Sequence, residues 1–152
     1  MSKSLIIAIC GKSAAGKDTL MKMLYKTFQE KNTPAHLMIS DTTRPKRINE
    51  QENVDYHFIS NREFQKNIWN NQYLEYAEFR KWYYGTHRLE VDRSVINIGV
   101  FNPKGIINLA ELQNEFIVLP VYLKVNFKER MRRSYNREEK FKFEYLRRAF
   151  VD

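Results

Sequence analysis

Residues 11–18, GKSAAGKD, follow the phosphate-binding pattern G-x-x-x-x-G-K-[ST] at every position except the last, where Asp18 replaces a hydroxyl. Such a loop binds phosphate because backbone N–H groups at a helix N-terminus converge on the oxygens, and Lys17 would reach the terminal phosphates. Magnesium is held largely by substrate phosphates and water, so a metal can still bind here, with Asp18 as a ligand through a water. The residues that we expect to hold a triphosphate and Mg²⁺ are Gly11, Ala14, Ala15, Gly16, Lys17, Asp18 and Thr19.

A second group of residues suits a phosphate dianion. Arg44 and Arg47 stand three positions apart on a predicted loop, and their planar guanidinium groups can each make two hydrogen bonds to one phosphate. Tyr56 and Tyr84 could add hydroxyl donors to the same group. The alternative for the two arginines alone is a solvated basic turn.

A third group suits a nucleobase. Ser40, Glu75 and Thr86 supply two hydroxyls and a carboxylate. A carboxylate that accepts from a purine's N1–H and exocyclic amine favours guanine over adenine, because N1 of adenine is itself an acceptor.

The charged stretch that begins at residue 126 carries Arg130, Arg133, Arg137 and either Arg147 or Arg148, whose guanidinium groups could contact a transferred phosphoryl group. Phosphoryl transfer depends mainly on positioning and charge neutralisation, and arginines on a closing helix pair would supply both. The alternative is a solvated helix face with pairs at i,i+4.

The elements that must position these groups alternate between strand and helix. Residues 5–10 form an apolar run bounded by Gly11, which is typical of a strand buried on both faces of a parallel sheet. We predict one α/β domain over 1–152 with a mainly parallel sheet flanked by helices, whose core is 1–39 and 94–152 and whose lid is about 130–145. A small subdomain is inserted at about 40–93, and Trp69 and the aromatic residues 82–84 are expected in its interior. The other expected elements of the core are a helix over 17–31, strands over 35–40, 94–100 and 115–125, and helices that begin at 103 and at 126. In the insert we expect short strands within 55–60, 73–79 and 82–86 and a helix that begins at 60.

Composition limits the classes of protein that fit. The chain of 152 residues has a formal charge of +8, which indicates an anionic partner. It contains no apolar run of about 20 residues, as a membrane span requires, and no secretory signal. The single cysteine, Cys10, is expected to be a buried thiol in a cytoplasmic protein, and His36, His57 and His87 lack metal-ligand spacing.

Two stretches of the chain resemble the nucleotide-accepting region of guanylate kinases: residues 40–60, SDTTRPKRINEQENVDYHFIS, and residues 73–86. The resemblance implies a nucleoside monophosphate kinase of the P-loop kinase superfamily, which transfers phosphate from ATP, with Mg²⁺, to GMP or dGMP. We also expect a monomer or homodimer with no membrane or nucleic-acid partner.

The resemblance also implies a role for each group of residues. It places Arg44, Arg47, Tyr56 and Tyr84 on the monophosphate, and Ser40, Glu75 and Thr86 on the base. The implied catalytic residues are Lys17, Arg44, Arg130, Arg133, Arg137 and Arg148.

The sequence departs from the family pattern in the strand over 94–100 and in the stretch between Thr86 and that strand, which is shorter than expected. Guanylate kinases usually carry a strand of the I-L-D-I-D type whose second Asp contacts guanine, and Asn97 and Gly99 stand at the two Asp positions here. Some phage-type deoxynucleotide kinases and ribose bisphosphate kinases also read G-K-D after the loop, so a kinase with another phosphorylated acceptor is an alternative. By resemblance a final strand and helix would follow Asp152, so we expect either a shortened variant or a fragment.

Two further classes of protein fit the residues less well. A guanylate kinase-like module that only binds a protein or phosphopeptide typically lacks the loop lysine, and Lys17 is present. A nucleic-acid binder would explain the charge but not the phosphate-binding loop, and the basic residues fit a pocket better than a stripe.

Overall fold

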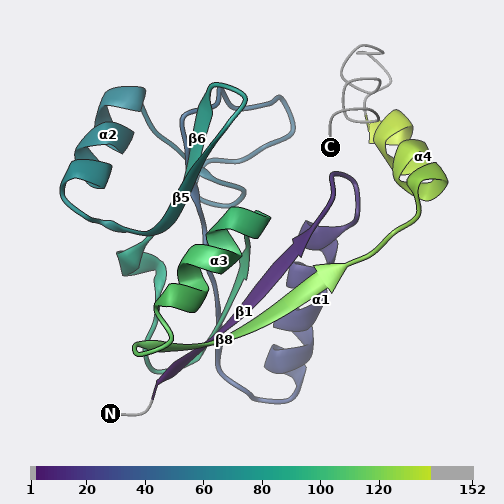
Figure 1. The fold of residues 1–152 in the computed structure, drawn as a ribbon. Helices are drawn as coiled ribbons and strands as arrows, with labels where there is room; N and C mark the ends of the chain where they lie inside the picture. The colour runs from purple at the N-terminus through teal and green to yellow at the C-terminus, as the bar shows by residue number, and fades with distance from the viewer. Residues whose placement is uncertain (1–2, 138–152) are drawn as a thin grey trace.

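The first strand, β1 (Ser4–Gly11), lies inside a four-stranded sheet and is buried along most of its length. The computed structural model describes residues 3–137, and Figure 1 shows their arrangement. The strand order is β2-β7-β1-β8, and every neighbouring pair is parallel. The other strands are β2 (Ala35–Leu37), β7 (Ile96–Val100) and β8 (Phe116–Leu123). The predicted parallel α/β sheet is confirmed, although β2 ends three residues earlier than expected.

Two helices cover opposite faces of this sheet because alternate residues of β1 point to opposite sides. Ile7 and Ile9 pack in a cluster with residues of α1 (Lys17–Glu30). Ile6 and Ala8 pack in the other cluster, to which α3 (Pro103–Glu111) contributes Leu109. Each fully buried aliphatic side chain stabilises the fold by about 1.5–3 kcal/mol.

Residues 41–87 contain a second, mixed sheet of order β4-β3-β6-β5. Its strands are β3 (Asp41–Thr42), β4 (His57–Phe58), β5 (Tyr73–Phe79) and β6 (Trp82–His87). Helix α2 (Asn61–Trp69) precedes β5, and its N-cap Ser60 accepts a hydrogen bond from Glu63 N, as the capping spacing predicts. A short 3-10 turn, η1 (Arg88–Glu90), follows β6.

The prediction that Trp69 lies inside this subdomain is wrong, because its side chain is 90% exposed. Phe64 is the fully buried residue of α2, and its ring stacks on Tyr73 and Tyr83 at 4.5 and 5.3 Å between centroids. Trp69 follows Phe64 by five residues, which turns it about 140° away around a helix. The position of Trp69 around the helix therefore exposes its indole ring, although the ring is hydrophobic.

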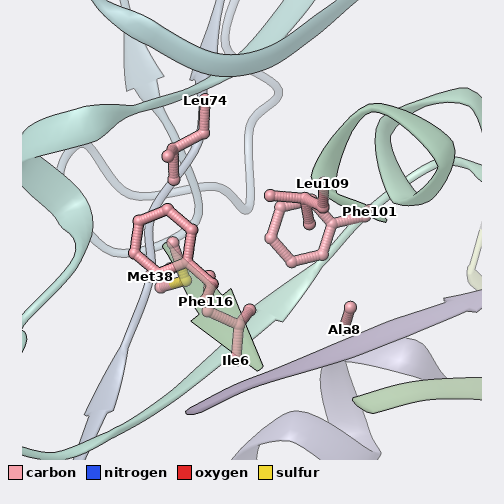
Figure 2. Packing of buried hydrophobic residues seen from close by; sticks show 7 residues of the cluster. All are labelled: Ile6, Ala8, Met38, Leu74, Phe101, Leu109 and Phe116. Carbon is pink, nitrogen blue, oxygen red and sulfur yellow. The ribbon is translucent and has the colours of Figure 1, made fainter. Parts of the chain in front are cut away.

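The second sheet is joined to the core by apolar packing. Figure 2 shows Leu74 of β5 pointing into the cluster that contains Leu109 and Phe101, together with Met38, Phe116, Ile6 and Ala8. Because Leu74 precedes Glu75 directly, this packing fixes β5 relative to α3.

A polar contact joins the two parts at η1. The Glu90 carboxylate accepts a hydrogen bond from Ile39 N at 2.8 Å and lies 3.2 Å from His57 Nε2. His36 Nε2 lies 3.8 Å from the same carboxylate, so two of the three histidines have structural partners here.

The last described element is α4 (Phe127–Arg137), where Asn126 Oδ1 accepts a hydrogen bond from Glu129 N, as the capping spacing predicts. Within residues 3–137, no helix combines the length and apolar character that a membrane crossing would need. Nor do those residues bring together three or more His, Cys, Asp or Glu side chains that could hold a metal.

Candidate active site

The phosphate-binding loop lies between β1 and α1, at the carboxyl end of a central parallel strand. Gly16 has φ 94° and ψ 28°, a left-handed conformation that glycine adopts without strain. A Cβ on Gly11 would lie 2.8 Å from the carbonyl oxygen of Leu123. Gly16 is therefore favoured by its left-handed backbone, and Gly11 by the close approach of Leu123.

The loop side chains separate into buried and exposed groups. Ala14 and Ala15 are buried, whereas Asp18 and Thr19 are exposed at the N-terminus of α1. Lys17 Nζ donates to the carbonyl oxygens of Gly11 and Lys12 at 2.9 and 3.1 Å. The ammonium group is thus held over the loop.

Two arginines of α4 contact the loop directly. Arg130 is 4% exposed and its Nη1 donates to Ser13 O at 3.3 Å, while Arg133 Nη1 donates to Ala15 O at 3.1 Å. Arg132, which lies between them in the sequence, points away from the loop into solvent and pairs with Glu129 at 2.9 Å. The bonds from Arg132 and then Arg133 lower the pKa of Glu129 to about 2.

Part of the predicted lid lies outside the described residues. Arg137 is the last residue of α4, and its side chain is not among the described parts of the chain. Arg147 and Arg148, with the rest of the lid after residue 137, lie outside the described residues.

Arg44 is held by a residue that the sequence did not single out. Arg44 Nη1 and Nη2 donate to the two carboxylate oxygens of Glu50 at 3.0 and 2.7 Å, and Glu50 also accepts from Arg47 N at 2.8 Å. Burial raises the pKa of Glu50, but the Arg44 and Arg47 contacts outweigh it and the net shift is downward. The signal in the sequence was a single acidic residue closing the basic loop TRPKRINE.

The two predicted tyrosines lie beside this arginine. The Arg44 guanidinium carbon is 5.6 Å from the ring centroid of Tyr56, and the rings of Tyr56 and Tyr84 meet edge-on at 6.1 Å. Burial lowers the pKa of Arg44, but the hydrogen bonds and charge of Glu50, with Tyr84 after them, outweigh burial and the net shift is upward. Burial, followed by the negative charge of Asp18, raises the pKa of Tyr56 to about 12.

The three candidate base-reading residues form one hydrogen-bonded chain. The hydroxyls of Ser40 and Thr86 are 3.1 Å apart, and Thr86 Oγ1 donates to Glu75 Oε1 at 2.8 Å. Glu75 is 5% exposed and Thr86 is fully buried. Burial raises the pKa of Glu75 to about 7, although the bonds from Thr86 oppose the shift.

The two positions that depart from the family pattern have structural explanations. Asn97 is fully buried and its side chain bonds the backbone of Asp92 twice, accepting from its N at 2.9 Å and donating to its O at 2.8 Å. A Cβ on Gly99 would lie 2.7 Å from the ring of Phe101. Neither position can present a carboxylate without repacking its surroundings.

Comparisons with known proteins agree with this geometry. A family model described as guanylate kinase matches residues 2–141. The guanylate kinase of Campylobacter jejuni (strain RM1221) is 40% identical over 84 residues, which cover 55% of this chain and 40% of that protein. The guanylate kinase of Onion yellows phytoplasma is 42% identical over 89 residues, which cover 59% of this chain and 41% of that protein.

The aligned part of the chain thus spans about two fifths of the length of these curated relatives. A crystal structure of guanylate kinase from Anaplasma phagocytophilum superposes with a TM-score of 0.66 at 27% identity, covering 88% of this chain and 68% of that one. The family model covers all of the described residues, including the loop and the Ser40–Thr86–Glu75 chain. This chain belongs to the guanylate kinase family.

Proposed function

We propose that this protein transfers the terminal phosphoryl group of ATP to a nucleoside monophosphate and that GMP or dGMP is its preferred acceptor. The proposal is carried by the buried Glu75 carboxylate, which accepts a hydrogen bond from Thr86, itself bonded to Ser40. The same chain contains a phosphate-binding loop with Lys17 held over it. Membership of the guanylate kinase family supports it.

Glu75 would discriminate between purines through hydrogen-bond direction. Ionised Glu75 accepts from guanine N1–H and the exocyclic amine, whereas adenine offers an acceptor at N1. Thr86 donates its hydroxyl proton to Glu75, which leaves the hydroxyl of Ser40, next to Thr86, as the group that would donate to a carbonyl oxygen of the base. A buried site built for such bonds rejects a base that leaves its groups unpaired.

Arg44 would bind the acceptor phosphate, with Arg47, Tyr56 and Tyr84 around it. Glu50 holds the Arg44 guanidinium through two bonds, so the side chain is oriented before the acceptor enters. An oxygen of the acceptor phosphate attacks the γ-phosphorus of ATP, the bond from that phosphorus to the β–γ bridging oxygen breaks, and ADP leaves. The attacking oxygen is already anionic, so no general base is required.

Lys17, Arg130 and Arg133 would stabilise charge on the transferred group. Arg130 and Arg133 already contact loop carbonyls, which places two cationic side chains of α4 beside the loop. Both would contribute through positioning and charge neutralisation, which dominate phosphoryl transfer.

Magnesium fits the exposed oxygen donors at the start of α1. Asp18 and Thr19 offer a carboxylate and a hydroxyl, which are ligand types that Mg²⁺ prefers, and most of its shell would come from ATP and water. When bound, the ion neutralises charge on the β- and γ-phosphates. A cytoplasmic location and a monomeric or homodimeric state remain predictions.

The proposal is tested by measuring ADP formation from ATP and Mg²⁺ with GMP, dGMP, AMP, dTMP and ribose 1,5-bisphosphate offered separately. We expect turnover with GMP and dGMP alone. Turnover confined to another acceptor would overturn the role of Glu75 while retaining a kinase. Absence of turnover with every acceptor, in protein that still binds GMP, would instead indicate a binding module.

A further inference from the structure

The first turn of α3 contains a glycine that local structure does not require. Gly105 is buried, and its N–H donates to the N-cap side chain of Asn102 at 2.7 Å. Its backbone is helical, a conformation that alanine adopts readily, and glycine is a weaker helix former than alanine. A reason for glycine must therefore lie outside the helix.

The space beside Gly105 is filled by Glu75. A Cβ at position 105 would lie 2.5 Å from Oε2, 3.0 Å from Cδ and 3.4 Å from Cγ of the Glu75 side chain. Those three atoms are its nearest neighbours, and all belong to the same carboxyl-bearing side chain. An added methyl group would thus meet the candidate base-reading group directly.

The backbone around this contact has little freedom to move apart. Leu74, next to Glu75, packs in one cluster with Leu109 of α3. On its other side Glu75 pairs with Thr86 of β6 in the antiparallel sheet. An added methyl at position 105 would consequently displace the end of the Glu75 side chain, which is flexible, rather than the strand or the helix.

We propose that Gly105 is a positioning residue for base recognition: the absence of a side chain there leaves room for the Glu75 carboxylate to stay bonded to Thr86 and available to the base. The inference rests on the proposed function, because it assigns Gly105 to the acceptor pocket. It identifies a determinant of acceptor specificity that lies 30 positions from Glu75 in the sequence.

The test uses Gly105→Ala, with Ile107→Ala as the matched control. Ile107 belongs to the same helix and is 62% exposed. We expect Gly105→Ala to raise the KM for GMP by about 10- to 100-fold, the effect of losing a hydrogen bond to a charged group, while the KM for ATP and the melting temperature stay near those of the wild type. Ile107→Ala should leave both KM values unchanged. An unchanged KM for GMP in Gly105→Ala, or equal increases for GMP and ATP, would overturn the inference.

A double-mutant cycle separates positioning from a general structural effect. In a Glu75→Ala background the methyl group of Gly105→Ala has no carboxylate to displace, so the second substitution should change the KM for GMP less than twofold. A full effect in that background would contradict the inference.

Carbon NMR of labelled glutamate gives a readout that needs no turnover. The Glu75 carboxyl resonance, assigned from its loss in Glu75→Ala, should shift in Gly105→Ala and stay in place in Ile107→Ala. If the wild type does not phosphorylate GMP, the proposed function fails, but this resonance still tests the contact between Gly105 and Glu75. An unshifted Glu75 signal in Gly105→Ala would refute that contact.

Discussion

Replacing Glu75 by glutamine should stabilise the protein at neutral and alkaline pH while impairing its use of GMP. Burial raises the pKa of the Glu75 carboxyl from 4.5 to about 7. Below pH 4.5 the group is protonated in both the folded and the unfolded chain. As the pH rises from 4.5 towards 7, the unfolded chain releases this proton and the folded chain keeps it, so the folded state loses relative stability.

The size of this loss of stability follows from the shift in the pKa of Glu75. Each pKa unit corresponds to about 1.4 kcal/mol, so the shift of Glu75 corresponds to a loss of about 3 kcal/mol above pH 7. The positive N-terminus of α3, next to Oε2, favours the ionised form by about 0.3–1 kcal/mol. Glutamine stays neutral at every pH, so its advantage over glutamate should grow by about 2 kcal/mol between pH 5 and pH 8.

The assay is urea unfolding of both proteins at pH 5, 6, 7 and 8, with the free energy of unfolding extrapolated to water. Glu78→Gln is the matched control, because Glu78 lies on the same strand and is exposed. The difference between wild type and control variant should not change with pH. A constant difference for Glu75→Gln as well, or a glutamine variant that is less stable than wild type at pH 8, would refute the reasoning.

Three other predictions follow from the site. Lys17→Ala should abolish phosphoryl transfer while Asp18→Ser retains or raises it, as measured by ADP formation; equal inactivity of the two variants would give Asp18 an essential role that the proposed mechanism lacks. Glu50→Gln should raise the KM for GMP about tenfold with little change for ATP, because Arg44 loses the charged partner that orients it; unchanged kinetics would mean that Glu50 plays no part in acceptor binding. Cys10 should resist a thiol reagent in the folded protein at pH 8 and react in urea, because it is buried and burial raises the pKa of its thiol despite Lys17 nearby; rapid labelling without urea would contradict its burial.

Local features of this protein were predictable from sequence because neighbouring residues encode them. The apolar run before Gly11 and the periodic helix after Lys17 fixed the context of the phosphate-binding loop. The capping residues Ser60 and Asn126 located the starts of two helices in the same way. The buried position of Cys10 was also predicted correctly.

Features that depend on the phase of an element or on distant contacts were not predictable. Arg130 and Arg132 are two residues apart, yet one packs on the loop and the other faces solvent, because a helix turns about 200° between them. The Glu75–Gly105 contact arises from the packing of β5 on α3, and no local pattern marks it. Resemblance to a family supplied Ser40, Glu75 and Thr86, and the fold brings the three into one hydrogen-bonded chain.

The most direct test of the proposed phosphoryl transfer is to follow the γ-phosphoryl group itself. ATP labelled at the γ-phosphate is incubated with Mg²⁺, GMP and the protein, and the nucleotides are separated, with Lys17→Ala as the control. We predict that the label appears in the β-phosphate of GDP with the wild type and not with Lys17→Ala. Label that stays in ATP, or that appears only as inorganic phosphate, would contradict the proposed transfer.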